Sequence, residues 1–378
     1  MSMSDLNRMQ LGDLLDYEQP TQYIVSSTDY DDTYDTPVLT AGQTFILGYT
    51  NETKGIYKAS KSNPVIIFDD FVTSFYLVDF DFKVKSSALK ILKPKKGVNI
   101  YYVYYAMLGI NFVPKEHARH WISKYSLFEI SYPSLAKQQE IVSHLDTFTT
   151  LISNLESELD MRRKQYEHYR NQLLDFEGVE GVEWKTLGEI GDVTKLAGFE
   201  FTEHVTYKEK GNIIALRGLN VRNGYLDLSD VKYIDGSNFE KLGRSRLYIN
   251  DMLFTYVGTI GNVALISEND KFYLAPNVSR IRLNESFIKS RFALYYFQCF
   301  SFINSQINKY LNASSMKNLT MENIRKFLLP ILPMPTQQEI VSKLDAFENL
   351  IQSLEQEIKL RKQQYEYYRE KLLTFEKE

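Results

Sequence analysis

Four residues in one short segment have the types found in the strand of a metal-dependent nuclease. Asp69, Asp70, Asp81 and Lys83 lie in the run FDDFVTSFYLVDFDFK and loosely match a pattern of two carboxylates and a lysine. The run also alternates charged with aromatic side chains, which is typical of an edge strand. We favour the edge strand and keep a self-contained nuclease as an alternative.

A second group with possible chemistry contains two histidines spaced by three, His117 and His120. Only Glu116 stands at ligand spacing beside them, and the single cysteine, Cys299, lies far away, so the sequence does not favour a metal site. We expect these histidines and Arg119 to contact the phosphates or base edges of DNA, or to lie on the surface. No GxxxxGK[ST] loop for ATP phosphates is present.

The second half of the chain holds better candidates for DNA contact. In YVGTIGNVA, Gly258 and Gly261 allow close approach of the backbone, and Thr259 and Asn262 can hydrogen-bond phosphate or bases. An ordinary hairpin turn is the alternative. Base edges in the major groove are read by basic and amide side chains. The further candidates in this half are Arg217, Arg222, Asn277, Arg280, Ser315 and Lys317.

A lysine-rich run supplies the candidates in the first half. The segment KVKSSALKILKPKK holds six lysines between positions 83 and 96. We expect Lys93, Lys95 and Lys96 to contact phosphate. A merely solvated lysine run is the alternative.

Composition limits the class of protein. The chain has 378 residues, 44 basic and 48 acidic side chains and a net charge of −4, which argues against simple polybasic binding of nucleic acid. Its length suggests two or three domains. The N-terminal stretch lacks the features of a signal peptide, and no run approaches the roughly 18 apolar residues of a membrane span. We expect a cytoplasmic protein without membrane contact.

A long internal repeat organises the chain. Residues 138–177 and 337–376 align at a constant offset of 199, with 24 of 40 positions identical. The chain is therefore a tandem duplication.

Each repeat segment carries apolar residues at alternating spacings of four and three, and each ladder is interrupted by one arginine. This sustained period without Pro or Gly predicts a coiled-coil helix. The ladder residues are Ile141, Leu145, Phe148, Ile152, Leu155, Arg162, Tyr166 and Tyr169 in the first copy, and Ile340, Leu344, Phe347, Ile351, Leu354, Arg361, Tyr365 and Tyr368 in the second. The arginines either set the register or bind an acidic partner residue, or are simply solvated. A pair of amphipathic helices in an all-α core is the alternative to the coiled coil.

The fold class predicted is α+β, because short alternating strands and single helices fill the segments outside the repeat. Two mixed globular domains are separated by two long helices, each about 60 Å long at 1.5 Å per residue. Because the two helices are far apart in sequence but alike in pattern, we expect them to pair with each other. The expected parts are a first domain at 1–137, a helix at 138–177, a linker at 178–183, a second domain at 184–336 and a second helix at 337–378.

This order of parts resembles the specificity (S) subunit of type I restriction-modification enzymes. The matching segments are ISYPSLAKQQEIVSHLDTF at 130–148, WKTLGEIGDV at 184–193, NDMLFTYVGTIGNVALI at 250–266, SSMKNLTMENIRKFLLPILP at 314–333 and LLPILPMPTQQEIVSKLDAF at 328–347. In the first domain, HARHWISKYSLFEI at 117–130 stands where a copy of the SSMKNLT segment is expected.

The resemblance implies a non-catalytic subunit that binds double-stranded DNA. Each globular domain would be a target recognition domain for one half of a bipartite site. The two helices would pair as an antiparallel coiled coil, with the pseudo-twofold symmetry of the tandem repeat, and would set the spacer between the halves. Two methyltransferase subunits would dock on the helices and supply S-adenosylmethionine chemistry. Motor-nuclease restriction subunits, which use ATP and Mg²⁺, would join for cleavage. No cofactor is expected in this chain.

The distribution of charge removes the objection raised by the net charge. The two repeat segments together hold 10 basic and 16 acidic residues, a net charge of −6, which leaves +2 for the rest of the chain. The acidity therefore belongs to the helices, and the proposed DNA-binding domains are slightly basic. A coiled-coil scaffold without DNA binding remains the alternative from another class of protein.

Overall fold

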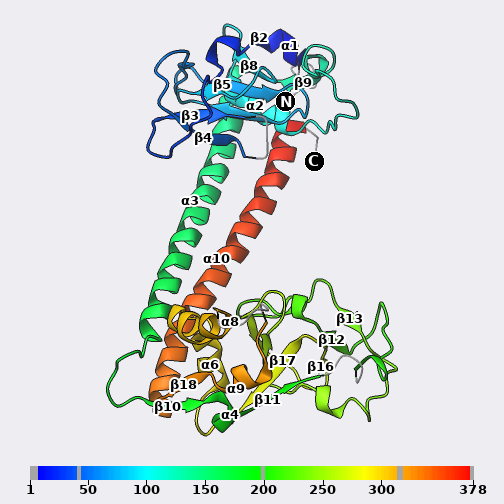
Figure 1. The fold of residues 1–378 in the computed structure, drawn as a ribbon. Helices are drawn as coiled ribbons and strands as arrows, with labels where there is room; N and C mark the ends of the chain where they lie inside the picture. Colours follow the sequence, from blue (N-terminus) through cyan, green and yellow to red (C-terminus); the bar gives the residue numbers. More distant parts are fainter. Residues whose placement is uncertain (1–6, 41–43, 197–200, 313–317, 375–378) are drawn as a thin grey trace. The chain divides into compact units, whose positions relative to one another are not determined.

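The computed structural model describes residues 7–40, 44–196, 201–312 and 318–374 (Figure 1). The chain divides into two compact units. Unit 1 comprises Met1–Glu156 and Gln356–Glu378, and unit 2 comprises Ser157–Glu355. Each unit therefore contains part of both repeat segments.

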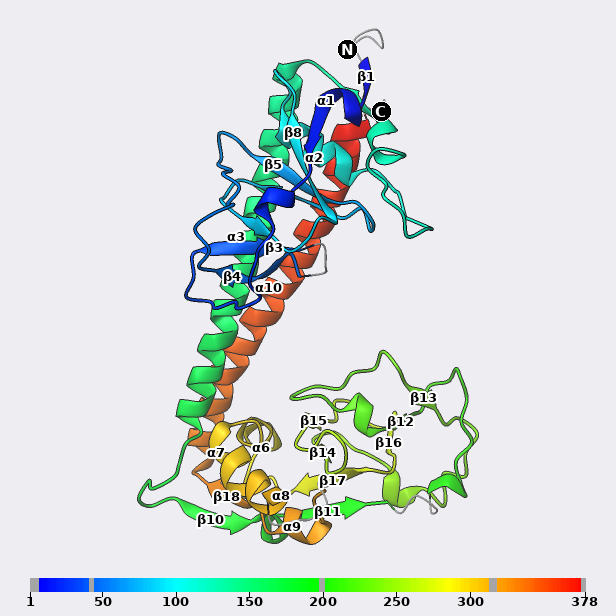
Figure 2. The same ribbon diagram turned by 45° about the horizontal axis from the view of Figure 1, so that its top comes forward.

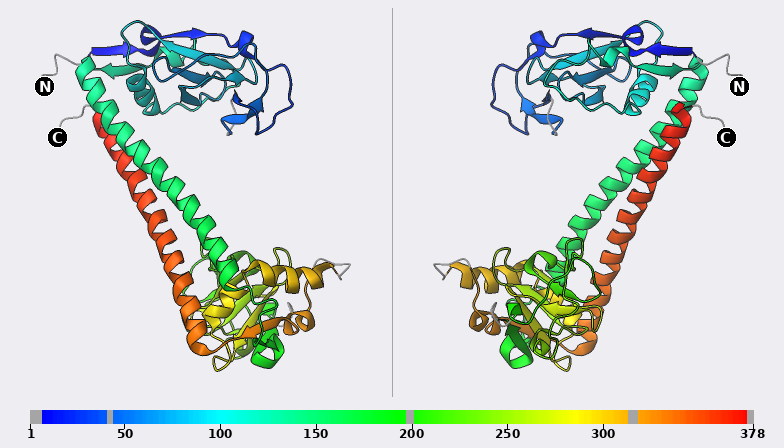
Figure 3. Two further views of the ribbon diagram at one scale, coloured as in Figure 1. Left: turned by 90° about the vertical axis from the view of Figure 1, so that its left-hand side faces the viewer. Right: turned by 90° about the vertical axis from the view of Figure 1, so that its right-hand side faces the viewer.

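The repeat segments form the two long helices α3 (Leu135–Leu173) and α10 (Met334–Thr374). Both begin three residues before the predicted positions, and α3 ends four residues before position 177. The two helices contact each other within each unit (Figure 3). In unit 1, the rings of Phe148 and Tyr368 stack with centroids 5.5 Å apart. In unit 2, Tyr169 stacks on Phe347 at 5.4 Å.

The arginine that interrupts each ladder lies along its own helix. Arg162 donates to Glu158 and Gln165 at 3.3 and 3.0 Å. Arg361 makes the equivalent bonds, to Glu357 at 2.8 Å and Gln364 at 2.9 Å. In both helices the arginine is therefore partly exposed and makes its hydrogen bonds within its own helix.

Unit 1 is a mixed helix and strand unit in which helix α2 covers a sheet (Figure 1). Its elements outside the long helices are β1 (Asn7–Gln10), α1 (Leu11–Leu14), β2 (Leu15–Glu18), β3 (Thr36–Leu39), β4 (Ile46–Thr50), β5 (Val65–Asp69), β6 (Phe75–Val78), β7 (Lys83–Val84), β8 (Leu89–Pro94), α2 (Ile100–Leu108) and β9 (Glu129–Tyr132), with short 3₁₀ turns at Thr21–Tyr23 and Tyr125–Leu127.

Unit 2 repeats this plan with longer connections. Its elements are β10 (Glu183–Thr186), α4 (Leu187–Ile190), β11 (Gly191–Lys195), β12 (Ile214–Leu216), β13 (Lys232–Tyr233), β14 (Met252–Thr255), β15 (Val263–Leu265), β16 (Phe272–Leu274), β17 (Val278–Leu283), α6 (Ser290–Tyr296), α7 (Phe300–Phe302), a π-helical turn (Ile303–Asn308), α8 (Lys309–Asn312), α9 (Met321–Arg325) and β18 (Leu328–Ile331), with short 3₁₀ turns at Gly218–Asn220 and Gly243–Ser245.

The same three sheets occur in both units. The four-stranded sheets have the orders β2-β8-β5-β6 and β11-β17-β14-β15, and the three-stranded sheets have the orders β4-β3-β7 and β13-β12-β16. A two-stranded ribbon, β1-β9 or β10-β18, completes each set. A single backbone hydrogen bond ties each ribbon to its short helix: Leu11 N–H donates to Phe128 O at 3.0 Å, and Leu187 N–H to Phe327 O at 2.7 Å. The duplication inferred from the helices therefore extends through the domains.

The inner strand β5 shows why the strands are so apolar. Successive side chains of a strand point to opposite faces. Ile66 and Phe68 pack with α2, α3 and the last turns of α10 in one core cluster, whereas Val65 and Ile67 pack with the three-stranded sheet in another. A strand buried on both faces reads as a continuous apolar run. The run FDDFVTSFYLVDFDFK includes only the end of this inner strand. Its next strand, β6, stands at the end of the order β2-β8-β5-β6, so the edge strand expected for this run is present.

The segment SRFALYYFQCFSFINSQINKYL, whose composition is that of one long helix, forms instead α6 and, after a turn, the consecutive pieces α7, a π-helical turn and α8. The chain turns at Gln298 and Cys299, after which Phe302 packs against Phe297 with ring centroids 4.3 Å apart. Phe302 also packs on Phe327 at 5.2 Å. The turn buries this aromatic cluster, which a straight helix would spread along its length. Among the described residues, no helix is both long enough and apolar enough to span a bilayer.

Candidate nucleic-acid interface

In unit 2, the loops after β12, β14 and β16 meet at one edge of the unit (Figure 2). The loop at 256–262 joins β14 to β15, which pair in antiparallel fashion, so the hairpin expected as the alternative is present. Gly258 and Gly261 have φ values of +76° and +95°, a region that only glycine enters without strain. The hydroxyl of Thr255 donates to Thr259 O at 2.5 Å and braces the loop from inside. The exposed side of this loop is thus held in a fixed shape.

Asn262 is partly buried, and its side-chain amide is bonded within the unit. Its side-chain Nδ2 donates to Val221 O at 3.0 Å. The backbone of the same region adds a bond from Gly224 N–H to Val263 O at 2.8 Å. Asn262 therefore joins the loop at 256–262 to the loop at 217–225. This bond gives Asn262 a positioning role, and its direct contact with DNA stays a prediction.

Both arginines of the 217–225 loop are held by acidic neighbours. Arg217 pairs with Asp230 at 3.1 Å and Arg222 pairs with Asp227 at 3.2 Å. Hydrogen bonds from Ser229, and then from Arg222, lower the pKa of Asp227. The side chains of the arginines are 26% and 45% exposed. A phosphate could exchange with these surface carboxylates at small cost, because exposed ion pairs contribute only about 0–1 kcal/mol.

The remaining candidates of unit 2 divide between the edge and the sheet. Asn277 is exposed at the start of β17, with φ of +70°. Arg280 lies within β17, is only 8% exposed and donates to Asp192 and Thr194 of neighbouring strand β11. Burial opposes ionisation of Asp192, but hydrogen bonds from Thr194 and Arg280 outweigh it and lower its pKa. Arg280 therefore stabilises the sheet, which corrects the expectation that it reads bases.

Two candidates, Ser315 and Lys317, lie outside the described residues. The segment that follows them does approach the same edge, because Leu319 N–H donates to Tyr256 O at 3.1 Å. Unit 1 has an equivalent bond from His120 N–H to Asp70 O at 2.8 Å. Residues 120 and 319 differ by the repeat offset of 199. The segment at 117–121 therefore lies in unit 1 where the sequence predicted the counterpart of the SSMKNLT segment.

The equivalent edge of unit 1 is built around a buried carboxylate. Asp70 is fully buried and accepts a hydrogen bond from Trp121 N–H at 2.8 Å. Its carboxylate also pairs with buried Lys90 at 3.2 Å and with half-exposed Arg119 at 3.4 Å. These contacts fix the 117–121 segment against the end of β5.

A surface patch at this edge brings together exposed His117 and Arg119 with partly exposed Phe71. The rings of Phe71 and His117 stack with centroids 4.7 Å apart, and the Arg119 guanidinium lies 5.5 Å from the Phe71 ring. His120 is not part of the patch. It is fully buried, with a ring nitrogen 3.1 Å from Glu116 O. The expectation that His120 contacts DNA or lies on the surface is corrected by this burial.

The lysine candidates lie at the other end of β8. Lys93 pairs with Glu18, and the hydrogen bond that it donates to this carboxylate raises the pKa of Lys93. Lys95 donates to Gly12 O at 2.8 Å, while Lys96 is exposed. Asp69 pairs with Leu89 at the opposite end of the strand, beside the 117–121 segment. The structure therefore separates these lysines from the patch of His117 and Arg119.

The four residues considered for a nuclease do not share a site. Asp69 accepts bonds from Phe71 N–H and Val72 N–H at 2.7 and 2.9 Å and so caps its own turn. Asp81 pairs with Lys58 on the surface at 2.5 Å, whereas Lys83 is buried beside Glu52 at 2.9 Å. Within the described ranges, no cluster of three or more His, Cys, Asp or Glu side chains could hold a metal ion.

The burial of the ladder residues changes along the two long helices. Those nearest the domains are fully buried or nearly so: Ile141, Leu145, Ile340 and Leu344. Those further along are partly exposed: Phe148, Ile152, Leu155, Arg162, Tyr166, Tyr169, Phe347, Ile351, Leu354, Arg361, Tyr365 and Tyr368. Away from the domains, the ladder positions of the two helices are therefore not fully covered.

Sequence reasoning missed the exposed apolar side chains at the edge of unit 2. Tyr225 is 62% exposed in the turn after Gly224, and Leu219 and Val257 are about 40% exposed beside it. The Asn-Gly turn signal in RNGY could have indicated an exposed aromatic at this tip. In unit 1, Phe71 was missed in the same way, although it directly follows the two aspartates of FDDF.

Comparison with known proteins agrees with this architecture. A family model described as the type I restriction modification DNA specificity domain matches residues 3–161 and 180–360. The chain therefore belongs to the type I restriction-modification DNA specificity family. It is 39% identical to the EcoR124I/EcoR124II specificity subunit of Escherichia coli over 391 residues, covering 98% of this chain and 94% of that one. A putative type I specificity subunit of Haemophilus influenzae is 26% identical, covering 88% and 86%.

Solved structures show the same fold at low identity. The S subunit of a type I restriction-modification system from M. genitalium superposes with a TM-score of 0.61 at 13% identity, covering 99% of this chain and 97% of that chain. A second structure, from a study of complex assembly in the type I system, has a TM-score of 0.56 at 13% identity, with 97% of each chain covered.

Proposed function

We propose that the chain is the specificity subunit of a type I restriction-modification complex, and that each unit binds one half of a bipartite DNA site. The observation that carries this proposal is the repeated topology. Two units with the same strand orders each present loops at the equivalent edge, after β5 and after β14. Two units with the same fold but different loop side chains suit an asymmetric site, because base contacts come from the loop side chains and not from the sheets.

Side-chain chemistry supports DNA as the ligand of both edges. Unit 2 offers Arg217, Arg222 and exposed Asn277, and unit 1 offers His117 and Arg119 over an aromatic ring. These are groups that donate to phosphates and base edges. The subunit itself is proposed to be non-catalytic, with no cofactor. A coiled-coil scaffold without DNA binding finds no support among the related proteins.

The long helices are proposed to form an antiparallel coiled coil with pseudo-twofold symmetry. The support is that an early residue of α3, Phe148, packs on a late residue of α10, Tyr368, whereas late Tyr169 packs on early Phe347. On this proposal, the helices set the number of unread base pairs and dock two methyltransferase subunits. Those subunits would bring S-adenosylmethionine, and restriction subunits would bring ATP and Mg²⁺.

The test is reconstitution of the chain with a methyltransferase subunit from the same system. In DNA footprinting, we expect the complex to protect two short half-sites separated by an unprotected spacer. Sequencing of the treated DNA should then show methylation of an adenine or cytosine in one motif. Protection without sequence preference, or a single continuous half-site, would overturn the proposal. Cleavage of DNA by the isolated chain with Mg²⁺ would favour the nuclease instead.

A further inference from the structure

Helices α2 and α6 occupy the same position in the two units. Each packs against the start of one long helix, and each places a tyrosine hydroxyl on an aspartate of that helix. Tyr105 donates to Asp146 at 2.6 Å in unit 1, and Tyr295 donates to Asp345 at 2.5 Å in unit 2. Burial, and then the hydrogen bond to the aspartate, raises the pKa of both tyrosines. The hydroxyls therefore stay protonated as donors.

The two sites differ one turn earlier on these helices. In unit 2, Arg291 donates to Asp345 at 2.9 Å and to Glu348 at 2.5 Å. The equivalent residue of α2 is Tyr101, which is neutral, and its hydroxyl donates away from the site, to Lys61 O at 3.2 Å. Unit 2 thus supplies a cation for its own aspartate, whereas unit 1 does not.

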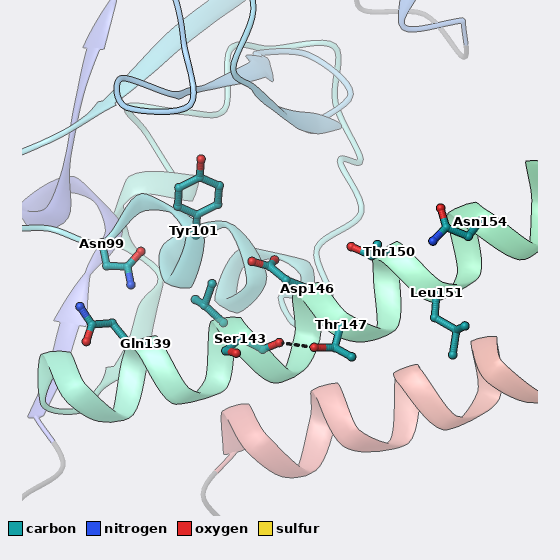
Figure 4. Close-up of a pocket in the computed structure, with 10 residues that line it drawn as sticks. Asn99, Tyr101, Gln139, Ser143, Asp146, Thr147, Thr150, Leu151 and Asn154 are labelled. Carbon is teal, nitrogen blue, oxygen red and sulfur yellow. Dashed lines mark hydrogen bonds between the residues drawn. The ribbon is translucent and has the colours of Figure 1, made fainter.

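Asp146 lies in a surface groove of about 680 Å³ along α3. Figure 4 shows its carboxylate between Tyr101 and Thr150. The other walls are neutral polar and apolar side chains, including Asn99, Gln139 and Ser143, and no lysine or arginine lines the groove. In the described part of the chain, Asp146 is an exposed carboxylate with a tyrosine donor and no ion pair.

We propose that this groove binds a lysine or arginine side chain of a partner protein. The bound side chain pairs with Asp146 in the same way as Arg291 pairs with Asp345. The occupant is a protein because the lone charge of the groove is negative and repels a phosphate backbone. The inference rests on the proposed function, in which the partner is a methyltransferase subunit docked on α3 and α10. The two docking surfaces are then unequal, since unit 2 has already neutralised its aspartate.

The test measures binding of the purified methyltransferase subunit to the full chain by calorimetry and native mass spectrometry, at low and high salt. Asp146→Asn keeps the shape of the side chain and removes its charge. We expect it to weaken one of the two binding steps on the order of tenfold, and to reduce the salt dependence of that step only.

Tyr101→Arg provides an independent variant. The introduced guanidinium reproduces the arrangement of Arg291, so it competes with the partner's cation and weakens the same binding step. Asp81→Asn serves as the matched control, since Asp81 is an exposed aspartate of unit 1 away from the groove, paired with Lys58. It should bind both subunits with unchanged affinity.

The outcomes separate the inference from the proposed function. Two equal binding steps, unaltered by Asp146→Asn and by Tyr101→Arg, would overturn the inference while the function stands. Failure of the unmodified chain to bind any methyltransferase subunit would overturn both. A circular dichroism spectrum and melting curve for each variant exclude unfolding as the cause of a weaker step.

Discussion

Gln138 and Gln337 hold the beginnings of the two long helices in the same way. Each is buried and donates from Nε2 to the carbonyl five residues before it, Pro133 O and Leu332 O, at 2.8 Å in both cases. The side chain of Gln337 makes two further hydrogen bonds. Its Oε1 accepts from Lys289 N–H at 2.8 Å, and its Nε2 also donates to Phe287 O at 3.0 Å. Oε1 of Gln138 has no protein partner in the described part of unit 1.

This difference predicts unequal costs for the same substitution. Gln337→Ala leaves a buried amide N–H and two carbonyls without partners, so we expect it to lower the free energy of unfolding by about 2–4 kcal/mol. Gln138→Ala removes one bond and should cost about 1–2 kcal/mol. Differential scanning calorimetry of each variant measures both losses. The control is Gln338→Ala, an exposed neighbour, which should change stability by less than about 0.5 kcal/mol. Equal losses for the two buried glutamines would contradict the assignment.

Asp70 is expected to be the most sensitive polar residue of unit 1. Asp70→Ala leaves the buried ammonium of Lys90 without its carboxylate, which costs about 3–5 kcal/mol. The double variant Asp70→Ala with Lys90→Met removes the stranded charge and should recover a large part of that loss. Urea unfolding followed by circular dichroism gives both values. Asp81→Ala, which breaks the surface pair with Lys58, should cost at most about 1 kcal/mol. A double variant no more stable than Asp70→Ala would show that the ion pair is not the cause.

Each unit is expected to control its own half of the recognised sequence. Arg222→Ala and Tyr225→Ala in unit 2 should relax one half-site, and Arg119→Ala in unit 1 should relax the other. Loss of one base contact corresponds to about 1–3 kcal/mol of discrimination. Sequencing of methylated bases in DNA from cells expressing each variant is the measurement. Arg280→Lys is a useful comparison, because Arg280 bonds within the sheet and should alter stability more than sequence preference. One variant that changes both halves would refute the division.

Cys299 is expected to report unfolding of unit 2. The thiol is fully buried, and burial raises its pKa to about 11 from an ordinary value of 9.0. The thiolate is the reactive form, so iodoacetamide at pH 8 should modify the folded chain at least about tenfold more slowly than the urea-unfolded chain. Because the folded pKa is the higher one, this group also disfavours folding as pH rises above about 9. Modification of the folded chain at the rate of a free thiol would contradict the buried site.

The repeat and its helices could be predicted from the sequence because a seven-residue period and a constant offset are visible without a structure. The side-chain partners could not. Arg280 was taken for a base reader because strand register, which places it opposite Thr194 of β11, is not readable from one sequence. His120 was misplaced for a similar reason, since a buried turn around Asp70 depends on contacts with residues 50 positions away. The partners of the lysine run, Glu18 and Asp16, were not visible from the sequence because they lie on another strand, and its contact with phosphate stays a prediction.

The composition of unit 1 has a consequence for the order of folding during synthesis. Its core includes Tyr365, Leu372 and Leu373 from the last turns of α10, packed with residues from the first third of the chain. On the ribosome, residues 7–156 emerge long before those turns exist, whereas unit 2 is continuous from Ser157 to Glu355. Unit 2 can therefore complete its core first. Unit 1 is translated first but completes its core last. Until then, the apolar residues that the end of α10 will cover are exposed to other chains in the cell.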